Sequence, residues 1–481
     1  MNAAASPAGL AATWDLRQGE RELLLSCLGC IALGFVLVLG SEHAAGRQLT
    51  ASAVLPLLIY GLSLIGLHLA LVLLQFRGDQ VLTAVVACLA GFGLLAQYRM
   101  GAFAGTLGVD NPELYLIPAG FAAMLLTAAA GANGRYRWLA KGLWLWAGVS
   151  LVLLVVLLVT GTRFRGAVYA LGFTTPTEVL KITVILGLAA YLEQHARALA
   201  RWHPRFPLLP PLRALWPLLV FWMLLLGLLA LQRDLGMIVI LSVTLLVVLV
   251  RATGRVGYLG YGLLAAAGVG ALVLTFFAHG QRRVEAWLDP FQDPTGDGWQ
   301  ILQGLSGMYA GGLWGEGFGN GSPEYTPIAR SDFIYAVIGE ELGFLGCVLV
   351  ALFFLILVQR GIMIAGQART DFGRLLAAGL TTVLAVQTLL NLGGVTKAIP
   401  LTGITLPFIS HGGASLLTTF TAVGLLLAIS DGPPGAARRP ARTVKRPPAA
   451  GATPPPAPAP APRPVERPAR PRRRPAAAKT P

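Results

Sequence analysis

Three aspartates spaced four residues apart have the residue type and setting for chemistry. Asp289, Asp293 and Asp297 stand in a stretch rich in Gly and Pro, and Arg282 and Arg283 precede them. A carboxylate beside cations can accept a proton from a hydroxyl as a general base, while the cations stabilise developing negative charge. Aspartates in loops are more often simply solvated. The residues alone leave both interpretations open.

Charged residues also stand inside or beside apolar runs, where a lone charge is unstable. Glu178 and Lys181 are three residues apart on one expected helix, so they should face each other and point inward. A structural ion pair and an anion-binding role for Lys181 explain this pattern equally well. Arg233 and Asp234, between two apolar runs, carry the same ambiguity.

The segment from Pro407 to Ser415 is the third candidate, because it joins two adjacent glycines, Gly412 and Gly413, to the hydroxyls of Ser410 and Ser415. A segment of this kind interrupts a helix and tends to line a cavity. His411 lies within it. That residue could relay a proton, although a hydrogen-bonded interfacial histidine is the more ordinary interpretation.

The elements that must position these residues are long apolar runs. The 481 residues are 55% hydrophobic and only 12% charged, which predicts an all-α polytopic membrane protein. The first run follows a polar segment with Arg17 and Arg21, so we expect a signal anchor rather than a cleaved signal peptide. About twelve transmembrane helices are predicted, near Leu23–Leu39, Ala51–Leu74, Val81–Ala96, Leu116–Ala130, Leu143–Val159, Val179–Leu192, Leu215–Leu231, Leu235–Val250, Tyr258–Ala278, Phe333–Leu357, Leu375–Leu392 and Ser415–Ile429.

The seventh and eighth runs have almost no loop between them. A single helix from Leu215 to Val250 would be about 54 Å long at 1.5 Å per residue, whereas the hydrocarbon core is only about 30 Å thick. We therefore expect two spans joined by a tight turn at Gln232-Arg233-Asp234.

The distribution of Lys and Arg between alternate loops predicts the orientation. One set of loops carries fifteen of these residues and the other nine, so the first set, with both termini, is cytoplasmic. The large loop between spans nine and ten, His279 to Asp332, is then extracytoplasmic. No ATP is available there, so an enzyme must use a substrate with its own activated bond. We find no P-loop, H-E-x-x-H or G-x-S-x-G motif.

Three regions are predicted along the chain. Residues 1–160 form an N-terminal five-helix membrane region, residues 161–430 a membrane core with the loop 279–332, and residues 431–481 a disordered cytoplasmic tail rich in Pro and Arg. The part of this tail from Gly432 onward holds +11 of the net charge of +15 and 16 of the 32 prolines. Its expected partner is the anionic leaflet or an acidic protein surface, and nucleic acid is not expected.

A succession of short motifs runs from about Gly161 to Ile429, and it closely resembles the SEDS family (shape, elongation, division and sporulation; RodA, FtsW and SpoVE). The motifs that carry the resemblance are Pro176-Thr177-Glu178 with Lys181, Asp234-Leu235-Gly236, the stretch from Trp287 to Gln300, Gly311 to Gly319, Ser331-Asp332-Phe333-Ile334, Gly339 to Gly343, and Ile399 to Gly403 running into Leu406 to Ser415. Five expected spans precede Gly161 where the family commonly has three, as in a RodA-like branch with two extra N-terminal helices.

The resemblance implies a peptidoglycan glycosyltransferase that polymerises lipid II, for cell elongation and shape or for division. It implies an inverting reaction at the outer face of the bacterial cytoplasmic membrane, with undecaprenyl pyrophosphate as the leaving group. By the same resemblance Asp293 is the base, and the substrate contacts are Lys181, Glu178, Asp234, Arg233, Asp332, Ser410, His411, Gly412, Gly413 and Ser415. Implied partners are a class B penicillin-binding protein transpeptidase and other elongation or division proteins. A divalent cation, Mg or Mn, is the only cofactor considered.

Several positions depart from the usual family pattern. Thr177 stands where Ser is common, Arg233 where Pro is common, His411 where Tyr is common and Ala414 where Ser is common, and Arg330 replaces a usual His or Glu. The aspartate and proline residues of the central loop match the pattern. The departures therefore concern substrate contacts rather than the expected base.

Two other functions, a transporter and a scaffold, would explain part of this sequence pattern. A lipid-precursor flippase or secondary transporter would suit the number of spans and the charges within them, but it should show an internal repeat and a site at the midplane. We find no convincing repeat, and the long loop favours an enzyme. A scaffold for division or elongation proteins would leave the polar cluster at the outer face without a purpose.

Overall fold

The computed structural model describes residues 7–46, 51–101, 111–164, 167–170, 175–202, 210–276 and 278–431, all within one compact unit. The predicted tail lies outside these residues except for Asp431. The described chain is almost entirely helical, as the apolar runs predict.

Each predicted span overlaps one long helix. In chain order these helices are α2 (Gln18–Ala44), α3 (Leu55–Leu73), α4 (Gln80–Arg99), α5 (Leu116–Gly131), α6 (Leu143–Thr160), α7 (Pro176–Leu199), α8 (Leu212–Gln232), α9 (Leu235–Thr253), α10 (Gly257–Phe276), α13 (Ile334–Gln367), α14 (Asp371–Val395) and α15 (Gly413–Ser430).

Nine helical segments of the described chain are long and apolar enough to cross a membrane. One of them, Pro112–Thr160, contains both α5 and α6, so the nine segments cover ten of the predicted spans. The other two are α7, which is not among the nine, and α10, which counts only as a shorter apolar helix over Gly257–Ala271. The chain is a multi-pass helical membrane protein, although the count of twelve spans is not reproduced by length and composition alone.

Shorter elements connect the spans. The helical ones are α1 (Pro7–Leu16), η1 (Ala51–Val54), η2 (Pro112–Tyr115), η3 (Ala132–Gly142), α11 (Ala278–Leu288), α12 (Trp299–Gly311) and η4 (Pro323–Tyr325). An antiparallel hairpin of β1 (Thr162–Phe164) and β2 (Ala167–Ala170) is the one exception to the all-α prediction within the described residues. The twelve predicted spans do not include α11.

The turn between α8 and α9 confirms that two spans meet at Gln232-Arg233-Asp234. Arg233 adopts a left-handed conformation with φ of 64°, which ends α8. Asp234 then caps α9, because its side chain accepts a hydrogen bond from the Met237 N–H at 3.0 Å. Aspartate is a favoured N-cap because its oxygen satisfies an otherwise unpaired N–H group.

Helix α15 lies in the core of the bundle and packs against α5, α7, α13 and α14. Its approach to α5 is close because two glycines leave room. A Cβ atom at Gly120 would overlap the ring of Phe420, and one at Gly424 would overlap the Met124 carbonyl. This packing fixes the start of α15 and the polar segment that precedes it.

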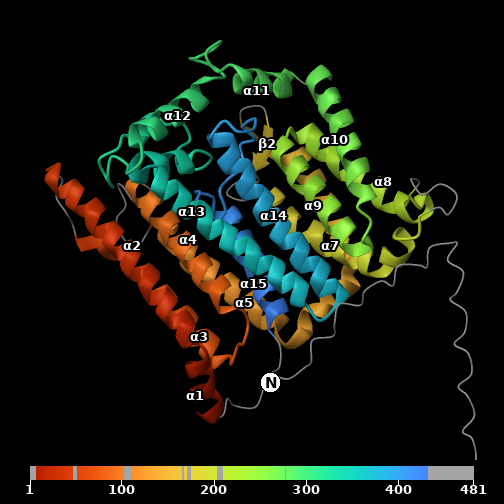
Figure 1. Ribbon diagram of the computed structural model, residues 1–481, viewed down its shortest axis with the longest axis horizontal. Helices are drawn as coiled ribbons and strands as arrows, with labels where there is room; N and C mark the ends of the chain where they lie inside the picture. The colour runs from red at the N-terminus through yellow and green to blue at the C-terminus, as the bar shows by residue number, and fades with distance from the viewer. Residues whose placement is uncertain are drawn as a thin grey trace, which may run out of the picture. The chain divides into compact units, whose positions relative to one another are not determined.

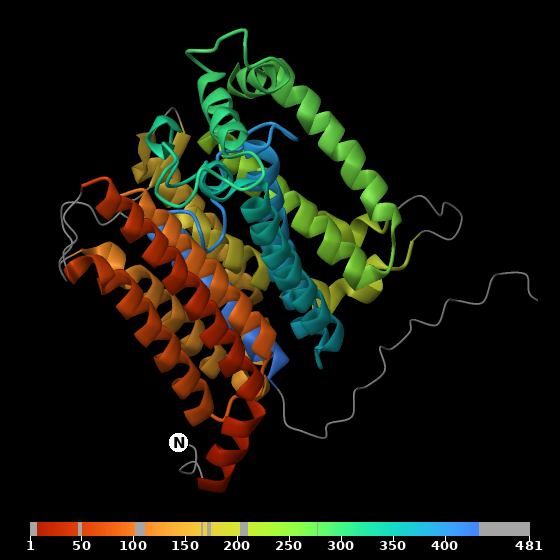
Figure 2. The ribbon, with the colours of Figure 1, turned by 60° about the vertical axis from the view of Figure 1, so that its left-hand side comes forward.

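The two ends of the bundle differ. Helices α11 and α12 lie across one end, and α1 lies at the other end (Figures 1 and 2). We call these the loop end and the tail end. The tail end is tied together by hydrogen bonds, because the buried Arg17 donates to the Phe76 carbonyl at 2.9 Å and the next residue, Arg77, donates its N–H to Asp431 at 3.1 Å.

Helices α2 and α3 form the N-terminal edge of the bundle, with α2 packed along α4. Their tail-end contacts are polar and buried. Arg17 pairs with Glu20, and Glu20 also contacts the Nδ1 atom of His68 at 3.0 Å. Because a charge buried alone would be unstable, this cluster fixes how α2 and α3 meet.

Asp431 belongs to the packed bundle, although the sequence assigned it to the tail. Its carboxylate accepts hydrogen bonds from the N–H groups of Arg77 at 3.1 Å and Asn133 at 3.2 Å. The neighbouring Ser430 hydroxyl accepts from the Asp79 N–H at 3.0 Å. The predicted boundary of the tail therefore moves to after Asp431.

We predict that Asp431→Ala lowers the thermal unfolding temperature in detergent, because two N–H groups lose their acceptor at a cost of about 1–3 kcal/mol. Truncation after Asp431 is the matched control, since it removes the tail and keeps the carboxylate. Unfolding temperatures should be measured for the full chain and both variants. An equal loss in the truncated chain would show that the tail itself stabilises the bundle.

Candidate active site

A cavity of about 830 Å³ opens at the loop end of the bundle. Its wall is built from segments far apart in the sequence: the starts of α7, α9 and α15, helix α11, residues 295–301, residues 327–332 and residues 401–405. Of the predicted site residues, the ones that line it are Glu178, Asp234, Asp332, His411, Gly412 and Ser415. Four helix N-termini at the wall, those of α7, α9, α12 and α15, give it partial positive charge.

The turn that contains Asp289, Asp293 and Asp297, here called the aspartate turn, lies at the rim of this cavity. Asp293 is exposed and does not line the cavity itself, but Thr295, Gly296 and Asp297 do. The Asp293 carboxylate accepts a hydrogen bond from the Asp297 N–H at 3.0 Å, which folds the turn back on itself. One oxygen of the carboxylate is thereby oriented by the backbone of a residue in the cavity wall.

Two glycines make this turn possible. A Cβ atom at Gly296 would overlap the Asp293 carboxylate, and one at Gly298 would overlap the Pro290 carbonyl. The Gly298 N–H also donates to the Asp293 carbonyl at 3.0 Å. The spacing of Gly in the aspartate stretch therefore holds the Asp293 side chain close to its own backbone.

Lys181 is held away from the cavity wall. Its ammonium donates to Glu178 at 2.6 Å and to the Gln387 side-chain oxygen at 2.8 Å, and it is almost fully buried. Glu178 is the member of the pair that lines the cavity, and Thr418 donates to it at 3.4 Å. Gln387 lies on α14 far along the chain, so this third partner could not be recognised from sequence spacing.

The two residues between α8 and α9 differ in position. Asp234 is buried and lines the cavity while capping α9. Arg233 is exposed, and the residues of the cavity wall do not include it. Its left-handed backbone explains why it departs from the proline that is common in the family, because proline cannot adopt a positive φ.

Cations reach the cavity from α11. Arg282 and Arg283 both line it, and Arg283 also donates to the Leu401 carbonyl at 2.9 Å. In the sequence these residues are recognised only as cations that precede the three aspartates. Their helix was not predicted, so its inward face could not be recognised.

Asp332 and the 401–415 segment complete the wall. The Ser331 hydroxyl donates to Asp332 at 2.8 Å, and Asn391 donates to the Asp332 carbonyl at 2.9 Å. Ser410 is buried, and its hydroxyl bonds the Ser331 carbonyl at 2.6 Å. Ser410 therefore joins the two wall segments and does not itself face the cavity.

The glycines and the last serine are close to this segment. Gly412 and Ser415 line the cavity, while Gly413 starts α15 and faces Leu116. The Ser415 hydroxyl is 3.2 Å from that of Thr405, another wall residue.

His411 joins a polar cluster at the rim. The Arg330 side chain donates to both carboxylate oxygens of Glu113, at 2.9 and 2.7 Å. The backbone N–H of His411 donates to the Arg330 carbonyl at 2.7 Å. Burial lowers the pKa of His411, which the Glu113 carboxylate opposes and Arg330 reinforces. Two of the five departures from the family pattern, Arg330 and His411, meet at this cluster.

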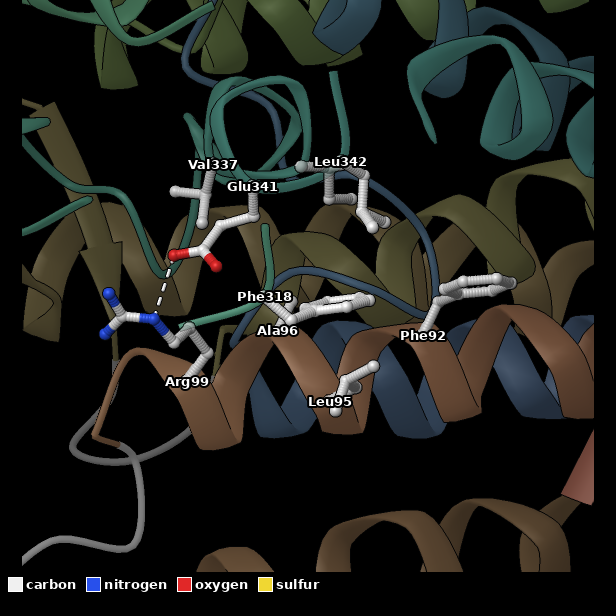
Figure 3. A pocket seen from close by; sticks show the side chains of 9 residues that line it. Phe92, Leu95, Ala96, Arg99, Phe318, Val337, Glu341 and Leu342 are labelled. Atoms are coloured by element: carbon white, nitrogen blue, oxygen red, sulfur yellow. Dashed lines mark hydrogen bonds and ion pairs between the residues drawn. The ribbon is translucent and has the colours of Figure 1, made fainter. Parts of the chain in front are cut away.

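A second hollow lies between α4 and α13 and is closed by the Arg99–Glu341 ion pair (Figure 3). Arg99 contacts Glu341 at 2.8 Å and donates to the Gly321 carbonyl at 2.7 Å. The hollow measures about 20 Å³, which holds about one water molecule. Its function is structural, because the ion pair ties the 316–322 loop to both helices.

Among the described residues, no three His, Cys, Asp or Glu side chains are grouped as metal ligands would be. Mg²⁺ often binds through one or two carboxylates and the phosphates of a substrate. A Mg or Mn ion held jointly by cavity carboxylates and substrate phosphates stays a prediction. The carboxylates that line the cavity are those of Glu178, Asp234, Asp297 and Asp332.

The arrangement suits transfer of a group with an anionic leaving group. It combines an oriented carboxylate at the rim with two arginines and four helix N-termini in one cavity. A carboxylate of this kind can take a proton, and the cations can stabilise the charge that leaves.

Comparison with known proteins agrees with the motif order. The model of the FtsW, RodA and SpoVE family of cell cycle proteins matches residues 79–432. The peptidoglycan glycosyltransferase RodA of Mycobacterium tuberculosis is 35% identical over 443 residues, 88% of this chain and 92% of the relative. The probable peptidoglycan glycosyltransferase FtsW of Trichlorobacter lovleyi is 36% identical over 370 residues, 74% of this chain and 93% of the relative.

A solved structure is also similar. A chain from a peptidoglycan synthase complex, described as coordinating polymerization and crosslinking, matches with a TM-score of 0.58 and 29% identity over 74% of this chain and 98% of that chain. The family match begins before α4 and includes α4 to α6, which the sequence assigned to the N-terminal region. The described helices outside the match are α1 to α3. The chain therefore belongs to the FtsW, RodA and SpoVE family of cell cycle proteins, the SEDS family.

Proposed function

We propose that this protein is a peptidoglycan glycosyltransferase that polymerises lipid II. The observation that carries the proposal is the cavity at the loop end, where the aspartate turn and the arginines of α11 meet. The relatives named as peptidoglycan glycosyltransferases, at 35% identity over most of this chain, support the same reaction. A transporter would bind near the midplane of the bundle, whereas this cavity lies where helices begin.

The reaction forms one bond and breaks one. The 4-hydroxyl oxygen of the acceptor sugar attacks the anomeric carbon of the donor, and the bond from that carbon to the lipid pyrophosphate breaks with inversion. Asp293 takes the hydroxyl proton. The lipid pyrophosphate leaves with the electron pair, and Arg282 and Arg283 stabilise its charge.

Glu178 and Lys181 act as a unit in this proposal. Lys181 holds Glu178 at the cavity wall through the 2.6 Å contact, and Gln387 holds Lys181. Glu178 and Asp234 then contact sugar hydroxyl groups as acceptors, as Asp332 does from the opposite wall segment. Asp234 and Asp332 are fixed by the hydrogen bonds described above.

We place the loop end on the outer face of the bacterial cytoplasmic membrane. The tail end gathers the start of α2 and the end of α15, so both termini are cytoplasmic in this orientation. The lipid-linked substrate then reaches the cavity from the outer leaflet. The structure of the synthase complex supports a crosslinking partner, and we propose a class B penicillin-binding protein in that role.

Asp293→Ala should reduce polymerisation about a hundredfold to ten-thousandfold, the usual contribution of a general base, with no change in unfolding temperature. The rate of glycan formation from lipid II measures this. Asp289→Ala is the matched control, because Asp289 is an equally exposed aspartate of the same loop that bonds the Phe291 N–H. A well-folded Asp293→Ala protein that works at the normal rate would remove Asp293 from the mechanism.

Gly296→Ala tests the position of the carboxylate without changing charge. The new methyl group overlaps Asp293, and a displacement of about 1 Å can cost about a hundredfold in rate. The double variant Gly296→Ala/Asp293→Ala should be no slower than Asp293→Ala alone. Additive losses would mean that the methyl group acts by obstructing the cavity.

Arg282→Gln should slow turnover about tenfold to a hundredfold, because a hydrogen bond to a charged group contributes about 1.5–3 kcal/mol. Arg283→Gln should be slower still, since it also loses the Leu401 carbonyl. Arg251→Gln, which changes an exposed arginine at the tail end of α9, is the control. Normal turnover in both α11 variants would show that Arg282 and Arg283 do not stabilise the leaving group.

A further inference from the structure

Helix α12 has two unlike faces, and one of them is fully used in packing. Ile301 is buried, Gly304 lies against Phe333, Met308 contacts Gly339 and Gly311 lies against the backbone of α13. These residues hold α12 on the start of α13. The helix is therefore a fixed part of the loop end.

The opposite face is uncovered and carries a row of side chains. Trp299 is 42% exposed and Tyr309 is 89% exposed, with Ser306 exposed and Gln303 half-buried between them. From Trp299 to Tyr309 the row extends about 15 Å along the helix at 1.5 Å per residue. The thirteen residues of α12 include no charged side chain.

This row continues directly from the cavity. Trp299 and Gln300, at the start of α12, line the cavity wall, while Tyr309 lies near the far end of the helix. A polymer that grows by repeated addition must leave a cavity of about 830 Å³ after a few additions. The surface next to the exit then meets every sugar added.

We propose that the uncovered face of α12, from Trp299 to Tyr309, is a binding track for the sugar backbone of the growing glycan strand. The inference rests on the proposed glycosyltransferase function. Sugar rings have an apolar face of C–H groups and a rim of hydroxyl groups. Aromatic rings pack on the C–H face of a sugar, and the Gln303 amide and the Ser306 hydroxyl form hydrogen bonds with the sugar hydroxyl groups.

The absence of charge on α12 favours a glycan strand over an anionic lipid surface or an acidic protein as the molecule bound there. An anionic lipid surface or an acidic protein would be met by Lys or Arg, and α12 has neither. The uncharged backbone of a glycan needs only ring faces and neutral hydrogen-bonding groups. A strand held on this face stays bound between additions, so the enzyme extends one strand repeatedly before releasing it.

The test compares strand lengths made from lipid II by the purified full chain and its variants, together with the initial rate of bond formation. Tyr309→Ala should shorten the strands about twofold to tenfold, from the contribution of one aromatic contact, with the initial rate unchanged. Tyr309→Phe should restore length, because it keeps the ring. Tyr325→Ala is the matched control, since Tyr325 is 70% exposed in the same loop but lies outside α12.

Strands of normal length from Tyr309→Ala would overturn the track. Equal shortening by Tyr325→Ala would overturn it as well, because exposed aromatics would then act as general anchors in the membrane interface or on a partner. A proportional loss of initial rate would assign Tyr309 to catalysis instead. A wild-type protein that makes no glycan would refute the proposed function itself. The wild-type assay therefore distinguishes failure of the proposed function from failure of the track.

Discussion

Several charges within the helical bundle are held in ion pairs, and some of these pairs join helices that are distant in the sequence. A single charge in the hydrocarbon core is costly, and breaking a buried pair costs about 3–5 kcal/mol. The Arg99–Glu341 pair joins α4 to α13, and Arg360 on α13 pairs with Asp79 before α4. Each pair therefore connects helices distant in sequence.

The same constraint explains why the candidate site lies at one end. Glu178 can face the cavity because Lys181, which also donates to the Gln387 side-chain oxygen, neutralises it from behind. Arg99 and the backbone of the 316–322 loop satisfy Glu341, which holds the segment leading to Asp332 in place. The polar cavity is thus supported by ion pairs in the helices beneath it and by the packing of α12 above it.

Much of this could be predicted from the sequence, and the rest could not for identifiable reasons. Long apolar runs marked every span, and the tight turn at Arg233 followed from the helix length alone. The motif order indicated the family and six of the residues in the cavity wall. Gln387 was not recognised because it comes from a helix distant in the chain, and α11 was missed because it is short and its polar residues were assigned to the large extracytoplasmic loop.

The most direct test of the central claim is made with the purified full-length chain in lipid vesicles that contain lipid II. Products should be separated by length, and the movement of lipid II between leaflets should be followed in the same vesicles. The account predicts a ladder of glycan strands whose formation releases undecaprenyl pyrophosphate. Movement of lipid II across the bilayer with no polymer formed would contradict it and favour a flippase.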